Sequence, residues 1–269
     1  MQYKIIFSDI DGTLLNKERA LSPATIETFK HLKEKLPIVL ISARMPAAMR
    51  HLQQDLEIED QPIISYNGGL ILVDGKTISS TEIAFDIMAD LSGFNKEINS
   101  HLSLYHNDEW YVPQWDKWAA REENNTRISP QIKSNAAVLE KWKAEKKSAH
   151  KIMAMGTEVE IDAIRDFLQK EFPDKLHLYR SKPTYLEIAN KEISKFTAIR
   201  FLLDNYFSFE PKDCIAFGDN YNDVEMIKGV GMGVAVANAR KEVLEVANLV
   251  TKAGIEDGVA ISLKEIFKL

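Results

Sequence analysis

The sequence is poor in cysteine, in long apolar segments and in basic residues relative to acidic ones. Cys214 is the single cysteine among 269 residues. No internal disulfide therefore forms, and the apolar run 214–217 around this residue predicts a buried, inert thiol. No apolar run approaches the roughly 20 residues that span a bilayer. Residues 1–9 lack the apolar region of a secretory signal, so we expect a cytoplasmic protein with no membrane partner.

The charge balance excludes a further class of function. The chain carries 34 Lys and Arg against 40 Asp and Glu, a net charge of −6, whereas a nucleic-acid-binding domain usually presents a basic face. Apolar residues make up 45% and charged residues 28% of the chain, which is typical of a folded globular protein. We expect a small-molecule partner and no nucleic acid.

Strands and helices alternate in the two outer parts of the chain. Short apolar runs are followed by segments with apolar residues at helical spacing, as in parallel sheets covered by helices on both faces. Ser22 and Pro23 begin the first helix as N-cap and first helical residue. The predicted strands are 3–8, 38–41, 62–66, 70–73, 214–217, 234–236 and 249–251, and the predicted helices are 23–36, 46–56, 195–203, 222–227, 240–247 and 258–267.

The middle of the chain has a different composition, because it contains all four tryptophans. Two of them, Trp115 and Trp118, are expected three residues apart on one helix. They would stack on a substrate ring or pack in a local core, and aromatic pairs at this spacing favour the core. The predicted strands here are 101–106, 109–112, 151–155, 176–179 and 185–189, and the predicted helices are 84–100, 115–127, 135–147 and 158–172. We predict a Rossmann-like α/β core with a parallel sheet, residues 1–83 and 188–269, interrupted by an inserted α+β cap domain, residues 84–187.

Two carboxylates follow the first predicted strand. Asp9 and Asp11 precede a Gly-Thr turn, and ligands of open α/β sheets bind beyond the carboxyl ends of the strands. On an extended chain the two side chains lie ~7 Å apart on one face. A cation between them relieves their repulsion, and Mg²⁺ commonly binds one or two carboxylates together with a substrate phosphate. The pattern favours such a site, although isolated Asp-x-Asp pairs also occur in solvated loops.

A second acidic segment follows the predicted strand 214–217. Asp219 and Asp223 lie at its carboxyl end, together with Asn222. These residues would complete a metal site with the first strand, or they would cap a helix, whose N-terminus favours Asn and Asp.

Two further segments carry polar groups suited to phosphate. Ser42, Ala43 and Arg44 follow the strand 38–41, where a hydroxyl and backbone N–H groups hold a phosphate oxygen or cap a helix. Lys195 begins a helix after the middle part, a position at which an isolated lysine is usually an ordinary surface residue.

Together these motifs resemble those of the haloacid dehalogenase superfamily, and in particular its Cof-type branch of sugar-phosphate phosphatases with a large α/β cap (subfamily IIB). The resemblance covers nearly the whole chain. Its most specific parts are 9–14, Asp-Ile-Asp-Gly-Thr-Leu, and 218–223, Gly-Asp-Asn-Tyr-Asn-Asp. At 42–44 the branch commonly has Thr-Gly-Arg, and this chain has Ser-Ala-Arg, which keeps the hydroxyl group.

The resemblance implies a Mg²⁺-dependent phosphomonoester hydrolase that acts on small phosphorylated metabolites through an aspartyl phosphate. Asp9 would be the nucleophile, and Asp11 would act first as acid and then as base. Mg²⁺ would be bound by Asp9, Asp219 and the backbone carbonyl of Asp11. The other implied roles are phosphate or substrate binding by Ser42, Ala43, Arg44, Lys195 and Asn222, and support of Asp219 or Lys195 by Asp223.

Two other functions stay open. A phosphosugar mutase uses the same intermediate but returns the phosphoryl group to the sugar, so steady phosphate release separates the two enzymes. A signalling receiver domain also combines an acceptor Asp with a Lys, but the inserted domain and the acid at Asp11 argue against it. The sequence fixes neither the metabolite nor the oligomeric state.

Overall fold

The computed structural model describes residues 3–269, which form two compact units. The first unit contains the residues up to Arg44, Met49–Ile78 and Ser194–Leu269, and the second contains Met45–Ala48 and Ser79–Ile193. Each unit has its own sheet and its own apolar core. Among the described residues, no helix has the length and apolar character needed to cross a membrane.

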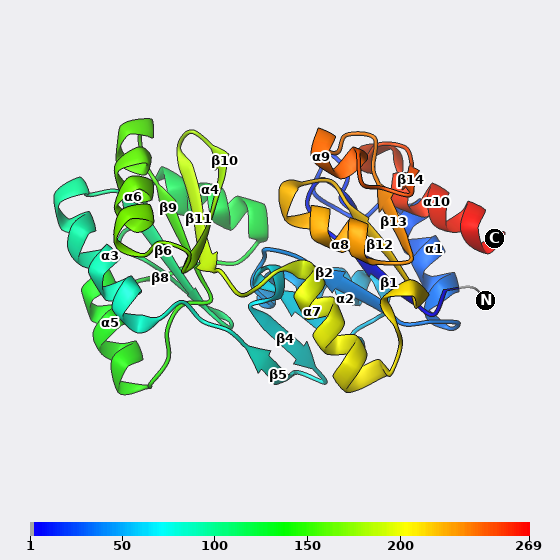
Figure 1. Cartoon of the computed structure of the whole chain (residues 1–269), viewed down its shortest axis with the longest axis horizontal. Coiled ribbons are helices and arrows are strands. Elements are labelled where there is room, and N and C mark those ends of the chain that lie inside the picture. The colour runs from blue at the N-terminus through cyan, green and yellow to red at the C-terminus, as the bar shows by residue number, and fades with distance from the viewer. Residues whose placement is uncertain (1–2) are drawn as a thin grey trace. The chain divides into compact units, whose positions relative to one another are not determined.

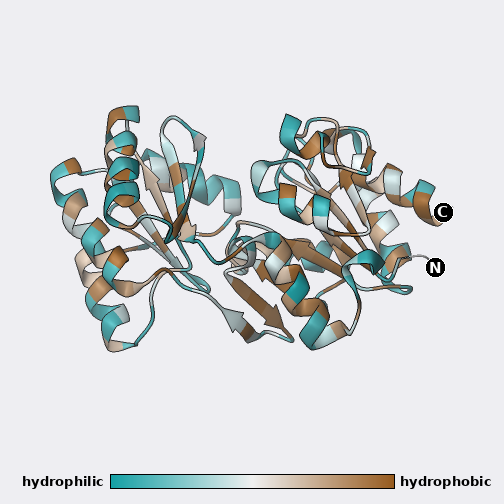
Figure 2. Cartoon of the chain, in the orientation of Figure 1, coloured by the Kyte–Doolittle hydropathy of each residue, from teal (hydrophilic) through white to brown (hydrophobic). Residues whose placement is uncertain are grey.

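The first unit is built on an eight-stranded sheet (Figure 1). Its order is β14 (Leu249–Val250), β13 (Met232–Ala235), β12 (Cys214–Gly218), β1 (Ile5–Ser8), β2 (Ile38–Ile41), β3 (Ile63–Ser65), β4 (Leu70–Val73) and β5 (Lys76–Ser80). Neighbours from β14 to β3 pair in parallel, and β4 pairs antiparallel with β3. Most of these strands are brown in Figure 2, because central parallel strands are buried on both faces.

Helices cover both faces of this sheet. They are α1 (Pro23–Lys33), α2 (Ala47–Leu56), α7 (Lys195–Leu202), α8 (Val224–Gly229), α9 (Lys241–Leu244) and α10 (Gly258–Phe267). On one face, α7 and α8 pack around alternate strand residues such as Phe7 and Val39. The intervening residues, such as Ile6 and Leu40, are fully buried as well. The predicted α/β fold with a parallel sheet is confirmed.

Two local predictions are also confirmed in this unit. Ser22 caps α1 by accepting a hydrogen bond from the backbone N–H of Thr25 at 3.0 Å. Cys214 is a free, fully buried thiol. Burial raises the pKa of that thiol to about 12, which keeps it protonated and unreactive.

The second unit has a six-stranded sheet with helices packed on one face. The strand order is β10 (Leu176–Lys182), β11 (Tyr185–Asn190), β9 (Lys151–Met155), β6 (His101–His106), β7 (Glu109–Val112) and β8 (Gln131–Ile132). All neighbours are antiparallel except β7 and β8. The helices α3 (Phe85–Ile98), α5 (Asn135–Ala144) and α6 (Glu158–Glu171) enclose a core that includes Leu104 and Trp142, and α4 spans Lys117–Thr126.

The prediction for Trp115 is wrong. The carboxylate of Asp116 accepts the backbone N–H groups of Trp118 and Ala119 at 2.8 and 3.0 Å, so α4 begins after Trp115. The side chain of Trp115 is consequently 51% exposed and lies outside the core. Trp118 does pack, with its ring edge-on to Tyr185 at a centroid distance of 5.4 Å.

Candidate active site

Three parallel strands end at one edge of the first sheet, and a polar residue of the predicted site follows each of them. β1 pairs with both β2 and β12, and Asp9, Ser42 and Asp219 are the residues directly beyond their ends. The N–H of Asp9 donates to the carbonyl of Phe217 at 3.0 Å, which continues the pairing past the end of β1. The parallel topology therefore gathers residues from both ends of the chain at one sheet edge.

Lys195 lies between two carboxylates of this site. Its Nζ donates to Asp9 Oδ1 at 2.5 Å and to Asp223 Oδ1 at 2.6 Å. All three side chains are buried, and Lys195 is fully so. Burial lowers the pKa of Lys195, but the charges of Asp223 and Asp9 outweigh this effect and raise it above its usual value. The side chain therefore stays charged inside the protein, where an unpaired ammonium would be costly.

The carboxylates of Asp9, Asp219 and Asp223 form a cluster in which one oxygen of each lies within 4.8 Å of the others. Burial and the neighbouring carboxylates raise the pKa of Asp9 well above its usual value, in spite of Lys195. Burial and the charge of Asp223 raise the pKa of Asp219 to about 6. One ammonium does not neutralise three carboxylates, and like charges at this spacing favour protonation or the binding of a cation.

The loops around the cluster fix the orientation of its carboxylates. Thr13 Oγ1 donates to Asp219 Oδ1 at 2.9 Å. Asp223 Oδ2 accepts the backbone N–H groups of Asp219 and Asn220, both at 2.9 Å. Gly12 has a φ of +91°, and a Cβ at this position would lie 2.4 Å from Asp219 Oδ2. The turn after Asp11 consequently needs a glycine, both for its backbone conformation and for the space that Asp219 occupies.

Asp11 has different partners from Asp9. Its Oδ2 accepts Arg44 Nε at 2.7 Å, and its Oδ1 accepts Arg44 Nη2 at 2.8 Å and Arg19 Nη2 at 3.0 Å. The side chain of Arg44 is 6% exposed, whereas those of Asp11 and Arg19 are 42% and 44% exposed. Partial desolvation raises the pKa of Asp11, but the hydrogen bonds and charge of Arg44, together with the charge of Arg19, hold it below its usual value. Among the described residues, Asp11 is not part of the carboxylate cluster.

The remaining predicted residues lie on the loops after β2 and β12. Ser42 is buried, and its Oγ accepts the backbone N–H of Arg44 at 3.2 Å, with Ala43 between them. Asn222 is half-buried, and its Nδ2 donates to Asn67 Oδ1 at 2.8 Å. The N–H of Asn67 in turn donates to the carbonyl of Ser42 at 2.9 Å.

Sequence reasoning missed three residues of this arrangement. Asn67 connects the loops after β2 and β12, and no role in the site was predicted for it. Thr13 was treated as part of the turn after Asp11, and its hydroxyl group as a partner of Asp219 was not foreseen. Arg19 gave no signal at all, because a single arginine in a polar loop is usually solvated.

The arrangement is that of a known family of hydrolases. Residues 6–263 match the family model of haloacid dehalogenase-like hydrolases. The chain belongs to this family. A candidate phosphatase of Haemophilus influenzae is 35% identical over 274 residues, which cover 99% of each chain. The resemblance found in the sequence is thus confirmed, and the chain is a haloacid dehalogenase-like phosphatase.

Two other relatives extend this comparison. A 5-amino-6-(5-phospho-D-ribitylamino)uracil phosphatase of Bacillus subtilis is 28% identical over 283 residues, with 98% of each chain covered. The crystal structure of a haloacid dehalogenase-like hydrolase from Bacteroides thetaiotaomicron has a TM-score of 0.91 and 26% identity, and the match covers 98% of this chain and 100% of that one. Both similarities extend over the two units of the phosphatase.

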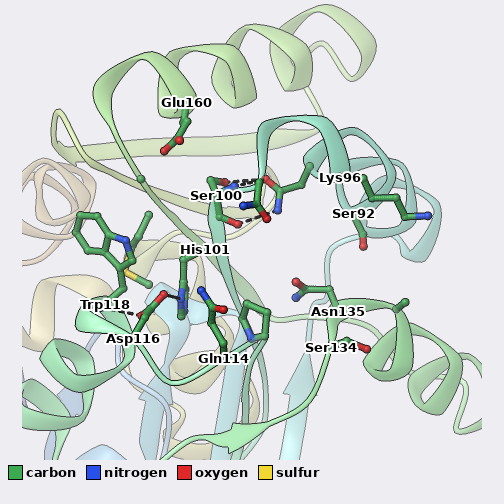
Figure 3. Close-up of a pocket in the computed structure, with 16 residues that line it drawn as sticks. Ser92, Lys96, Ser100, His101, Gln114, Asp116, Trp118, Ser134, Asn135 and Glu160 are labelled. Carbon is green, nitrogen blue, oxygen red and sulfur yellow. Dashed lines mark hydrogen bonds and ion pairs between the residues drawn. The ribbon is translucent and has the colours of Figure 1, made fainter.

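The second unit of the phosphatase contains a separate polar cavity of about 480 Å³ (Figure 3). His101 lies at this cavity, with Nδ1 at 2.8 Å from Asp116 Oδ2 and Nε2 at 3.0 Å from Ser103 Oγ. The order Ser-His-Asp is that of a hydrolytic triad. Ser103 is fully buried, however, so its hydroxyl group is out of reach of a substrate. We interpret the chain of hydrogen bonds as a structural feature that orients His101.

Proposed function

We propose that this phosphatase is a Mg²⁺-dependent phosphomonoesterase that acts on small phosphorylated metabolites, with sugar phosphates as the expected class, through an aspartyl phosphate on Asp9. The observation that carries the proposal is the buried Asp9 beside Lys195, Asp219 and Asp223 at the carboxyl ends of parallel strands. The Bacillus subtilis relative, whose named substrate is a ribityl phosphate, supports a phosphorylated metabolite of this kind.

The residues at the strand ends fit a divalent cation. Asp9, Asp219 and Asp223 offer oxygen ligands within 4.8 Å of one another, and Mg²⁺ prefers oxygen ligands. Burial, and after it the charges of the neighbouring carboxylates, raise the pKa values of Asp9 and Asp219, and a bound cation would oppose both effects. Asp9 and Asp219 would hold Mg²⁺ together with the backbone carbonyl of Asp11, and Asp223 would orient Asp219 and Lys195. The bound ion would reduce the repulsion between Asp9 and a phosphate dianion.

In the proposed mechanism, an Asp9 carboxylate oxygen forms a bond to phosphorus as the bond from phosphorus to the alcohol oxygen breaks. Arg44 and Arg19 favour the ionised form of Asp11 in the free protein, so Asp11 would take up a proton when Arg44 binds the substrate, and it would give this proton to the departing oxygen. Asp11 then accepts a proton from water, whose oxygen attacks the phosphorus of the acyl phosphate and regenerates Asp9. Each turnover consumes one water and releases one alcohol and one inorganic phosphate.

Cationic and amide groups near Asp9 would bind the transferring phosphoryl group. Lys195 Nζ already donates a hydrogen bond to Asp9, and a second hydrogen bond to Asp223 holds it in this position. Ser42 Oγ, the N–H of Ala43 and the amide of Asn222 would supply further donors to the phosphoryl oxygens, which carry the charge in the transition state. Arg44 would bind the substrate at the side of Asp11.

The test is phosphate release from a panel of sugar phosphates and other small phosphate esters, with and without Mg²⁺. We expect activity that excess chelator abolishes and Mg²⁺ restores, with poor support by Ca²⁺, which prefers more ligands at longer distances. Asp9→Asn removes the nucleophile at nearly constant shape and should leave less than a few per cent of the activity, about a 10²-fold loss or more. Asp55→Asn, at an exposed carboxylate of α2, is the matched control.

Three outcomes would contradict the proposal. Full activity in excess chelator would exclude the role of Mg²⁺, and an active Asp9→Asn variant would exclude the nucleophile. Transfer of the phosphoryl group back to the sugar without steady phosphate release would instead identify a mutase.

We further propose that the second unit, predicted as residues 84–187, is the cap that selects among phosphate esters. Its separate sheet and core support this role, because domains that cover active sites commonly complete the substrate pocket.

A further inference from the structure

The loop between β1 and α1 places one arginine in an unusual backbone conformation. Arg19 has a φ of 57°, in the left-handed region that residues other than glycine, asparagine and aspartate seldom adopt. Three hydrogen bonds close this loop. Asn16 N donates to the carbonyl of Ala20 at 3.0 Å, Arg19 N donates to the carbonyl of Asn16 at 3.1 Å, and Ala20 N donates to Asn16 Oδ1 at 3.0 Å. They fix the point from which the side chain of Arg19 extends.

From this point the guanidinium group of Arg19 reaches Asp11. Arg19 Nη2 lies 3.0 Å from Asp11 Oδ1, which also accepts Arg44 Nη2 at 2.8 Å. The bidentate pair with Arg44 already satisfies both oxygens of Asp11, and exposed ion pairs such as that of Arg19 contribute little to stability. A residue that keeps an unfavourable backbone conformation, and whose side chain contacts a reacting group, is a candidate for a functional role.

The two oxygens of Asp11 differ in their partners. Among the described residues, Oδ2 accepts a hydrogen bond from Arg44 Nε alone, whereas Oδ1 is shared by Arg44 and Arg19. To protonate a leaving oxygen, Asp11 needs one oxygen free of guanidinium donors. If Arg44 binds the substrate, as proposed above, Oδ2 would become free while the bond from Arg19 would still hold Oδ1.

We propose that Arg19 is a positioning residue for Asp11, which it holds by Oδ1 so that Oδ2 faces the leaving oxygen. The inference rests on the proposed role of Asp11 as the acid. The proton moves from the Asp11 carboxyl group to the departing oxygen as the bond from phosphorus to that oxygen breaks. Arg19 itself touches neither the phosphoryl group nor the leaving oxygen.

The test compares leaving groups that differ in their need for a proton. p-Nitrophenolate departs unprotonated, whereas phenolate, a stronger base, benefits from an acid. The quantity measured is kcat/KM for p-nitrophenyl phosphate and phenyl phosphate, because it reports the steps up to the departure of the leaving group and excludes hydrolysis of the aspartyl phosphate. Arg19→Asn is the main variant, since asparagine tolerates the left-handed backbone and is too short to reach Asp11.

We expect Arg19→Asn to lower kcat/KM for phenyl phosphate about tenfold and that for p-nitrophenyl phosphate by less than about twofold. Its melting temperature should equal or exceed that of the unmodified protein. Arg19→Lys should recover part of the loss, because it keeps a donor of the same charge. Lys17→Gln removes a charge from an exposed residue of the same loop and should change neither value.

Asp11→Asn, measured in parallel, separates this inference from the proposed function. Asp11→Asn should also lower kcat/KM more for phenyl phosphate than for p-nitrophenyl phosphate, and the difference should be larger than that of Arg19→Asn. If Asp11→Asn affects both substrates equally, the acid role of Asp11 is refuted, and the inference falls with it. If Asp11→Asn discriminates between the substrates and Arg19→Asn does not, or if Arg19→Asn raises the activity, only the role of Arg19 is overturned.

Discussion

Replacing Gly12 by alanine adds a single methyl group next to the carboxylate cluster. Gly12 has a φ of +91°, and the added Cβ would lie 2.4 Å from Asp219 Oδ2 and 2.8 Å from its Cγ. Ordinary van der Waals contact with a Cβ begins at 3.4 Å. The carboxylate of Asp219 therefore has to move by about 1 Å, and this movement would break its 2.9 Å hydrogen bond from Thr13.

The substitution has two separable costs. A Cβ in the left-handed region destabilises the fold by ~1–2 kcal/mol. A displacement of about 1 Å in a group that positions the reaction typically lowers the rate about 10²-fold. Only the second cost depends on Asp219, so the loss of activity should exceed what the loss of stability explains.

Gly75→Ala is the matched control for the backbone cost. Gly75 has a φ of +71°, and no atom lies within 4 Å of a Cβ built there. We expect both variants to lose ~1–2 kcal/mol of unfolding free energy in urea. Only Gly12→Ala should lose activity, by about 10²-fold in kcat/KM with a weaker apparent affinity for Mg²⁺. Equal activity of the two variants, both folded at the assay temperature, would refute the assigned contact between Gly12 and Asp219.

Two further predictions concern the second unit. Burial and His106 lower the pKa of His150 to about 3, so above pH ~6.5 the side chain is neutral in both states and its contribution to stability is constant. Below that pH the unfolded chain binds a proton that the folded protein does not, and stability falls by about 1.4 kcal/mol per pH unit toward pH 3. Asn107 N–H donates to His150 Nδ1 at 3.1 Å, and His150→Gln can keep this acceptor. The free energy of unfolding of His150→Gln, measured in urea between pH 4 and 6, should depend less on pH than that of the unmodified protein, by about 1.4 kcal/mol per pH unit. An unchanged pH dependence would contradict the lowered pKa of His150. Exchange of residues 84–187 for the corresponding segment of the Bacillus subtilis relative should transfer that protein's substrate preference; a preference that stays with the first unit would disprove the cap role.

The strands that could be predicted from the sequence are those that are buried along their whole length. β1, β2 and β12 are buried at every residue, so an unbroken apolar run identifies each of them. β5 and β8 were not predicted, because they are short and largely exposed strands without apolar alternation. Trp115 was placed on a helix because its spacing from Trp118 fits one, but Asp116 caps the helix, which begins at Lys117, two residues after Trp115.

In the active site too, local features of the sequence were predictable and contacts between distant loops were not. Asp9, Ser42 and Asp219 were predicted because each directly follows a strand, which is a local property of the sequence. The contacts of Asn67 with Asn222 and of Arg19 with Asp11 depend on how loops fold back onto the sheet edge. No periodicity or composition encodes such a contact, so a single sequence gives no signal for it.

The charges of the site connect the nucleophile to the proposed cation. Asp9 must be ionised to attack phosphorus, yet burial and the carboxylates of Asp223 and Asp219 raise its pKa, and Lys195 opposes them only in part. Lys195 is shared with Asp223, so its charge is not available to Asp9 alone. A divalent cation at Asp9 and Asp219 would supply the missing positive charge and lower the pKa of both carboxylates. The nucleophile would then be fully ionised only in the cation-bound enzyme, and the proposed Mg²⁺ requirement would be a property of the carboxylate cluster, independent of the substrate.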